Sequence, residues 1–306
     1  MAQIDVREIS EGELDTLVEI ANAVEPDAGA RAANFVDWRR QAEDMAWLLA
    51  ERDGEAVGQA VVLVGWHSPP HLAIAQLAVL SQHRDRGAGT ALLHSVSAWA
   101  GERGATELKV EVRENDLASL AWAERRGFRE AGRNSTLALD LTAVEPLPPE
   151  PPPGIEIVSW AERPEVAAGL YEVAREASPD IPGNEDDAIG TFEEWLSRDM
   201  QGVSDRPEAT FVALAGEEVV GFAKLSIGSE DRAFHDLTGV RRAWRNRGIA
   251  AALKRTQIAW AKEQGFARLQ TSNEERNEPI RRLNERHGYR PEPGKIVLRG
   301  PLSGGS

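Results

Sequence analysis

Two short stretches combine arginine and glycine at the same spacing, Arg84-Asp-Arg-Gly-Ala-Gly89 and Arg245-Asn-Arg-Gly-Ile-Ala250. Each follows an apolar run typical of a buried strand and precedes a run with helical spacing. The start of a helix carries unpaired amide N–H groups and a partial positive charge, and glycine lets the backbone approach a bulky anion. We therefore predict that both loops bind a phosphate or pyrophosphate. The alternative is a plain strand-to-helix turn whose glycines serve only the geometry.

A sequence repeat surrounds the two loops. Residues 84–128 align without gaps with residues 245–289 at an offset of 161, with 15 identities in 45 positions. Chance would give about two or three, so the repeat indicates a duplicated domain. Two matching loops in matching surroundings favour the phosphate-binding interpretation over the plain turn.

The boundary between the copies is a proline-rich stretch, Val144-Glu-Pro-Leu-Pro-Pro-Glu-Pro-Pro-Pro-Gly154. Proline at this density prevents a helix and favours an extended spacer. We predict an N-terminal domain at residues 1–143, a linker at 144–154 and a C-terminal domain at 155–306. The chain has 306 residues, which suits two domains of about 150 residues each.

Each copy has the order strand, loop, helix, strand, helix, which predicts an α/β (α+β) fold with parallel neighbouring strands. The expected elements are 71–80, 88–103, 107–112 and 117–126 in the first copy, and 234–240, 249–264, 268–271 and 279–287 in the second.

Composition excludes several classes of function. The net charge is −15, which argues against nucleic acid or an anionic membrane as the main partner. The chain has no cysteine, so disulfides, zinc–thiolate sites and a thiol nucleophile are excluded, and we expect no metal. The longest apolar stretch, near residues 60–66, is far shorter than the roughly 20 residues of a membrane span. We expect a soluble, cytoplasmic protein.

The two loops and their surroundings resemble the GNAT superfamily of acyl-CoA N-acyltransferases, present twice in tandem. The residues that carry the resemblance are the two loops, the preceding Leu77-Ala-Val79 and Thr238-Gly-Val240, and the closing Trp122–Phe128 and Leu283–Tyr289. The resemblance implies, in each domain, a mixed central sheet flanked by helices, with two parallel strands that splay apart. It also implies that the loops hold the pyrophosphate of the co-substrate acetyl-CoA, through Arg84, Asp85, Arg86, Gly87, Ala88 and Gly89 and through Arg245, Asn246, Arg247, Gly248, Ile249 and Ala250.

The resemblance implies a reaction without a covalent enzyme intermediate. Backbone N–H groups around Val79 and Val240 would polarise the thioester carbonyl, and an amine would attack it directly. Asn277 lies where the family has an asparagine near the pantetheine arm, and Asp116 matches it in the first copy. A side-chain cap for the following helix explains both residues equally well.

The sequence departs from the family at the group that protonates the departing thiolate. Family members often place a tyrosine four residues before the Gly-aromatic pair, but Ala123 and Asn284 stand there. Asn284 can still donate a hydrogen bond to sulfur, whereas Ala123 cannot. This difference favours the C-terminal domain as the active one.

Asp236 is the candidate general base, because it shares a strand face with Thr238 and Val240. The alternative is an ordinary polar residue of the strand. The corresponding stretch of the first copy offers only Gln76, which again indicates a degenerate first site.

We predict an N-acetyltransferase that moves an acetyl group from acetyl-CoA to the primary amine of a small molecule. One alternative is acetylation of a cysteinyl amine by an enzyme like mycothiol synthase, a family that also has tandem GNAT domains. Another is a non-catalytic acyl-CoA-binding or scaffold protein. We expect a monomer with an internal pseudo-dimer, or a homodimer.

Overall fold

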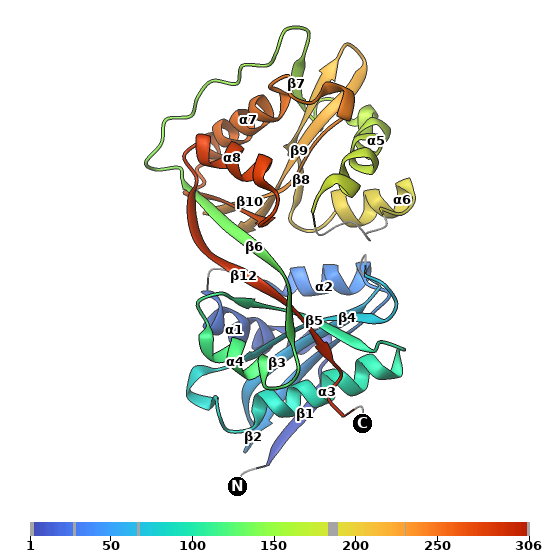
Figure 1. The fold of residues 1–306 in the computed structure, drawn as a ribbon, viewed down its shortest axis with the longest axis vertical. Coiled ribbons are helices and arrows are strands. Elements are labelled where there is room, and N and C mark those ends of the chain that lie inside the picture. The colour runs from blue at the N-terminus through green and yellow to red at the C-terminus, as the bar shows by residue number, and fades with distance from the viewer. Residues whose placement is uncertain (1–2, 27–28, 66–67, 183–188, 230, 305–306) are drawn as a thin grey trace. The chain divides into compact units, whose positions relative to one another are not determined.

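A computed structural model describes residues 3–26, 29–65, 68–182, 189–229 and 231–304 (Figure 1). The chain forms two compact units. Unit 1 comprises Met1–Arg133 together with Lys295–Ser306, and unit 2 comprises Asn134–Gly294.

Unit 1 is a mixed sheet with helices on both faces. Its strands lie in the order β1, β2, β3, β4, β5 and β12, with bounds Ile4–Glu8, Asp44–Arg52, Glu55–Val64, Leu72–Val79, Glu107–Arg113 and Arg290–Pro301. Its helices are α1 (Leu14–Val24), α2 (Ala32–Gln41), α3 (Ala88–Glu102) and α4 (Leu117–Glu124), with 3-10 turns at Glu11–Glu13 and Ser81–His83. Strand residues alternate between two cores, so that Trp47 and Leu49 pack with α1 and α2 while Ala46 and Leu48 pack with α3.

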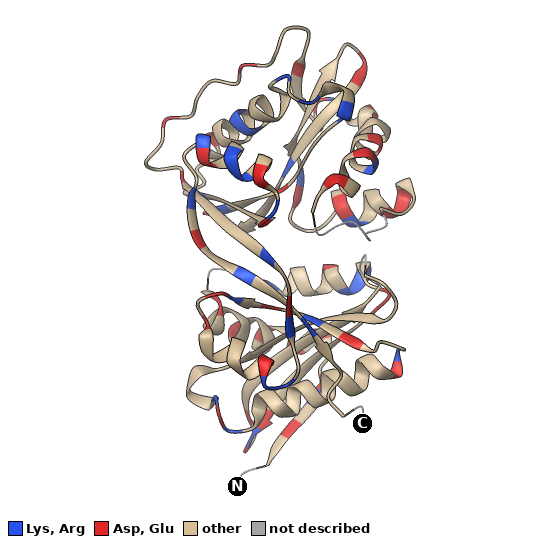
Figure 2. Ribbon diagram, viewed as in Figure 1, with Lys and Arg blue, Asp and Glu red and all other residues tan. Residues whose placement is uncertain are grey.

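Unit 2 repeats this architecture. Its strands lie in the order β6, β11, β10, β9, β8 and β7, with bounds Arg129–Asp140, Arg268–Glu274, Arg232–Val240, Glu218–Ser229, Asp205–Ala215 and Glu156–Ser159. Its helices are α5 (Ala167–Ala177), α6 (Phe192–Trp195) with a π-helical extension (Leu196–Met200), α7 (Ile249–Glu263) and α8 (Glu278–Arg286), with 3-10 turns at Pro164–Val166, Ser178–Asp180 and Arg242–Trp244. Acidic residues lie on α5 and α6, shown in red in Figure 2.

The sixth strand of each unit comes from the other half of the sequence. Residues 295–301 of β12 pair antiparallel with β5 in unit 1, and residues 134–140 of β6 pair antiparallel with β11 in unit 2. The boundaries 1–143 and 155–306 follow the sequence repeat, whereas the compact units follow these exchanged strands.

In each unit the central parallel strands pair briefly and then separate. The pairing of β4 with β5 covers only 72–74 against 107–109, and that of β10 with β11 only 232–235 against 268–271. We call the separated segments the fork: residues 75–79 and 110–113 in unit 1, and residues 236–240 and 272–274 in unit 2. This arrangement confirms the predicted fold class.

The fork of unit 2 contains a β-bulge that unit 1 lacks at the matching place. On β10, His235 pairs with Leu225 and Thr238 with Ala223 of β9, so Lys224 faces two residues. In unit 1, β4 pairs with β3 residue by residue from Ile74 to Val79. Because a bulge redirects side chains and backbone groups, the two forks present different chemistry.

Candidate active site

The two arginine–glycine loops adopt nearly the same backbone conformation. Asp85 and Asn246 have φ of 60° and 61°, and Gly87 and Gly248 have φ of 95° and 88°. Each glycine is the N-cap of a helix, α3 or α7. Left-handed residues at alternate positions before a helix start turn successive amide N–H groups toward one point, which makes a concave anion site.

The first arginine of each loop folds back onto its own strand. Arg245 Nε donates to the Val240 carbonyl at 3.0 Å, and Arg84 Nε donates to the Val79 carbonyl at 3.4 Å. Arg245 also pairs with Asp180 at 2.8 Å. These arginines therefore hold the loop against the strand end.

The remaining loop residues lie at the helix starts. Ile249 and Ala88 are buried first residues of α7 and α3, which anchor the helices to the sheet. The Arg247 guanidinium lies over the Trp244 ring at 4.8 Å, and the Arg86 carbonyl accepts a hydrogen bond from Arg52. The second positions of the helices, Gly89 and Ala250, are both small.

The strand ends place backbone N–H groups toward the forks. The amide of Arg241 donates to Val220 of β9, so by strand alternation the amide of Val240 points away from β9. The Leu80 amide, which donates to Val57, orients Val79 in the same way. An N–H group in this position is suited to polarise a carbonyl lying in the fork.

Asp236 belongs to an ionic cluster at the bulge of β10, centred on a buried lysine. Lys224 Nζ lies 2.6 Å from Asp236 and 2.9 Å from Asp205, and it also donates to the Asp199 carbonyl. The side chain of Lys224 is 4% exposed, whereas that of Asp236 is 47% exposed. Ser226 Oγ donates to the same carboxylate at 3.1 Å.

The charges of this cluster are set by burial and pairing together. Burial acts to raise the pKa of Asp236, but the Lys224 ammonium and the hydrogen bonds from Lys224 and Ser226 outweigh it and lower that pKa. The pKa of Asp205 is raised by burial, which Lys224 only partly offsets. Burial lowers the pKa of Lys224, but the two carboxylates raise it further, so Lys224 stays protonated. Asp236 is therefore a fixed anion at neutral pH.

Asn284 lies on the other side of the fork, inside the unit. It is fully buried on α8, and its Nδ2 donates to Asn273 Oδ1 at 3.4 Å. Asn273 also accepts from Thr271 Oγ1 at 3.1 Å. The Asn284 Oδ1 atom is buried without a hydrogen-bond partner among the described residues.

The matched residues Asn277 and Asp116 differ in their contacts. Asp116 caps α4 by accepting the Ser119 amide at 3.0 Å, and it pairs with Arg84 at 3.5 Å. Asn277 is the N-cap of α8, but its side chain makes no capping hydrogen bond. The side-chain amide of Asn277 is thus available to a ligand, whereas the Asp116 carboxylate is occupied by the protein itself.

The sequence interpretation missed a group of buried polar residues behind the fork of unit 2. His235 Nδ1 bonds to Gln257 Oε1 at 3.0 Å and its Nε2 bonds to the Tyr289 hydroxyl. The buried Lys254 ammonium lies 5.5 Å from the centre of the Tyr289 ring. A signal was present, because Lys254 and Gln257 interrupt an apolar helix face where the first copy has Leu93 and Val96.

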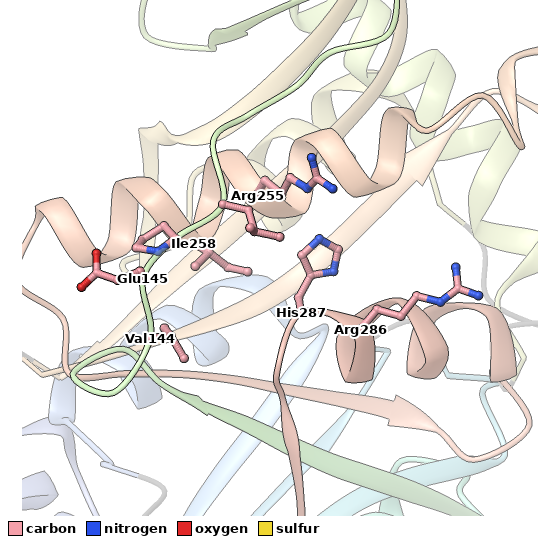
Figure 3. A pocket seen from close by; sticks show the side chains of 8 residues that line it. Val144, Glu145, Arg255, Ile258, Arg286 and His287 are labelled. Atoms are coloured by element: carbon pink, nitrogen blue, oxygen red, sulfur yellow. The ribbon is translucent and has the colours of Figure 1, made fainter.

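A cavity of about 160 Å³ lies between the start of the linker and helices α7 and α8 (Figure 3). Its lining includes Val144, Glu145, Arg255, Arg286 and His287, none of which is a predicted site residue. In the described part of the chain, no cluster of three or more His, Asp and Glu side chains is arranged to hold a metal ion. No helix among the described residues is long and apolar enough to cross a membrane.

Comparison with known families confirms the resemblance and its duplication. The model of the acetyltransferase (GNAT) family matches residues 12–128 and 168–289. An aminoglycoside N(6')-acetyltransferase type 1 from Stenotrophomonas maltophilia is 32% identical over 114 residues, 35% of this chain and 74% of that protein. An L-2,4-diaminobutyric acid acetyltransferase from Nocardia farcinica is 34% identical over 84 residues, 26% of this chain, and the match spans 44% of its length.

Two solved structures share the fold over nearly the whole chain. A GCN5-related N-acetyltransferase from Sphaerobacter thermophilus has a TM-score of 0.77 at 23% identity, covering 99% of this chain and 97% of that one. A tandem GNAT protein from the clavulanic acid biosynthesis pathway has a TM-score of 0.79 at 19% identity, covering 99% and 100%.

Proposed function

Because the chain belongs to the acetyltransferase (GNAT) family, we propose that unit 2 transfers an acetyl group from acetyl-CoA to a primary amine of a small molecule. The amine attacks the thioester directly while both substrates are bound. The names of the two curated relatives describe acetylation of small molecules that carry amino groups, which supports this class of acceptor. Unit 1 is a copy that keeps the binding loop and lacks the catalytic groups.

The observation that carries the proposal is the difference between the two forks. In unit 2, Asp236 lies at the bulge of β10, and Asn284 lies on α8 next to the other fork strand, β11. The matching positions in unit 1 are Gln76 and Ala123, so unit 1 has no carboxylate at the first position and no side-chain donor at the second. A proton acceptor for the amine and a hydrogen-bond donor to the sulfur both assist acetyl transfer, and of these two pairs of matched positions the pair in unit 2 offers both groups.

Each group has a specific role in the proposed reaction. The amides of residues 246–250 bind the pyrophosphate, and the free side-chain amide of Asn277 binds the pantetheine arm. The Val240 N–H polarises the thioester carbonyl. Asp236 accepts a hydrogen bond from the neutral attacking amine. As the N–C bond forms, it passes the excess proton to water, because a carboxylate of lowered pKa keeps a proton poorly. Asn284 donates a hydrogen bond to the departing sulfur.

Release of the coenzyme A thiol tests the proposal. The chain has no cysteine, so a thiol reagent detects only the product. The intact chain is incubated with acetyl-CoA and a panel of small mono- and polyamines, beside Asp236→Asn and the matched unit 1 variant Gln76→Ala. We expect acceptor-dependent thiol release that Asp236→Asn reduces by about 10²-fold and Gln76→Ala leaves unchanged. Tight acetyl-CoA binding without any acceptor-dependent release would instead identify a non-catalytic binding protein.

A further inference from the structure

The interior behind the fork is polar in unit 2 and apolar in unit 1. Positions in the two units correspond by the offset of 161 or, for His235, by the register of the parallel strands. The polar set is His235, Lys254, Gln257, Asn273, Asn284 and Tyr289. The matching set is Ala75, Leu93, Val96, Val112, Ala123 and Phe128, all in or against the hydrophobic core of unit 1. The fold itself therefore does not require polar groups at these positions.

Among the polar set, Lys254 has the burial that is least favourable in free energy, because its side chain carries a charge. It is 1% exposed, and its ammonium forms no hydrogen bond or ion pair with the residues that the structure describes. Its contact is the face of the Tyr289 ring, 5.5 Å from the ammonium. An ammonium buried without a carboxylate is strongly unfavourable, and leucine fills the same place in unit 1. The ammonium is thus available to a group that arrives with a ligand.

Helix α7 runs beside β10 from the phosphate-binding loop to the apex of the fork. At its start, Ile249 packs with Val240 at the open end of the strand. Further along, Lys254 shares the Tyr289 ring with His235, the last residue of β10 paired with β11. The Tyr289 amide in turn donates to the Asn284 carbonyl at 3.2 Å. Lys254 therefore lies at the closed end of the fork of unit 2, where the Tyr289 side chain joins it to His235 on β10. The Tyr289 backbone is hydrogen-bonded to Asn284, the residue proposed to face the sulfur.

We propose that Lys254 donates a proton to the sulfur of coenzyme A as the thioester breaks, an inference that rests on the proposed acetyl transfer in unit 2. The amine lone pair forms the new N–C bond, and the C–S bond breaks with its electron pair on sulfur. The sulfur takes a proton from the Lys254 ammonium, while the excess proton of the amine leaves through Asp236 to water. Lys254 regains a proton from solvent after the thiol departs. It takes the role that the family resemblance assigns to a tyrosine at the position of Asn284.

The pKa shifts of the neighbouring groups indicate that Lys254 is the group of this cluster that can donate a proton near neutral pH. His235 faces it from β10, Tyr289 from the segment before β12, His287 from the end of α8, and Arg255 lies next to it on α7. Burial, then the Lys254 charge, lowers the pKa of His235, and burial raises that of Tyr289, so both are neutral near pH 7. Burial, with the nearby arginines and Lys254, also lowers the pKa of His287. Burial lowers the pKa of Lys254 to about 7, below the value of about 8.5 typical of a thiol, so proton transfer to the thiolate is downhill.

The test is the pH dependence of kcat in the full chain and in Lys254→Met, which keeps the length of the side chain and removes its charge. A required acid makes wild-type kcat fall as the pH rises above about 7. We expect Lys254→Met to lose this alkaline limb and about 10²-fold in kcat at pH 7, with the dissociation constant of acetyl-CoA changed less than threefold. The control Tyr289→Phe keeps the ring under the ammonium and introduces the residue of unit 1, so it should retain the limb.

Three outcomes would overturn the inference. Lys254→Met that keeps kcat within twofold and the same alkaline limb excludes Lys254 as the acid, while the proposed function stands. Loss of the limb in Tyr289→Phe but not in Lys254→Met assigns the proton to the tyrosine. Absence of acceptor-dependent turnover in the wild-type chain removes the proposed function and this inference together.

Discussion

A negative charge placed at Gly248 should abolish acetyl-CoA binding in unit 2. The residue caps α7 with φ of 88°, a conformation that Asp and Asn tolerate better than most side chains. A Cβ atom there would lie 3.6 Å from Pro152, an ordinary contact, so the added side chain has room. A carboxylate about 5 Å from a pyrophosphate charge costs about 3 kcal/mol at an effective dielectric constant of 20, which is more than 100-fold in affinity.

The matched control for Gly248→Asp is Gly248→Asn, which has the same size and backbone preference without the charge. Calorimetric titration of acetyl-CoA into both variants and into Gly87→Asp separates the two loops. We expect Gly248→Asp to lose the unit 2 site and thiol release, Gly248→Asn to bind within about tenfold of wild type, and Gly87→Asp to keep turnover. Equal weakening by Asp and Asn at position 248 would refute the argument, because the backbone and not the charge would then be responsible.

Three further predictions concern stability and binding. Asp116→Ala should lower the free energy of unfolding by about 1 kcal/mol because it removes a helix cap, whereas Asn277→Ala should leave that free energy unchanged and weaken acetyl-CoA binding. Urea denaturation measures the first effect and calorimetric titration the second, and the same behaviour in both variants would contradict the prediction. Gly221→Ala should destabilise by about 1–3 kcal/mol, because its Cβ would lie 2.9 Å from a backbone carbonyl of β10, whereas Gly132→Ala meets no atom within 4 Å and serves as the control in urea unfolding. Hydrogen bonds from two arginines lower the pKa of Asp180 to about 2 from 3.8, so its stabilisation is present above pH 3.8 and lost as the pH falls toward 2; the difference in stability between wild type and Asp180→Asn should close over that range, and a constant difference would refute the assignment.

The sequence allowed the loops, the strands and the flanking helices to be predicted, because each has a local signal. The separation of the two parallel strands was expected only from the family resemblance. Glycine at left-handed positions and helical spacing after an apolar strand are both visible within a few residues, as at Gly87 and Gly248. Duplication strengthened these signals, since the same residue pattern occurs at matching positions in both copies.

Features set by distant contacts were not predictable in the same way. β5 and β11 are corresponding strands of the two units, and each has one edge that can pair with a further strand. No local sequence signal indicates that residues 295–301 pair with β5 and residues 134–140 with β11. The bulge in β10 shifts the match between copies by one residue, which hides that His235 corresponds to Ala75. A single lysine in an apolar run also resembles a surface residue, so the burial of Lys224 and Lys254 emerges only when the sheet and helices are assembled.

The exchanged strands determine the order in which the sheets of the two units can be completed during synthesis. Glu107 pairs with Pro301, so the sheet of unit 1 stays one strand short until residues 295–301 have left the ribosome. Unit 2 needs only residues 134–294, which are made earlier, and it can close first. Pairing over such a long stretch of sequence slows folding and leaves the edge of β5 open in the meantime. Separate expression of the two sequence halves would leave that edge permanently unpaired, so a chain cut in the proline-rich linker should be studied as two fragments made together.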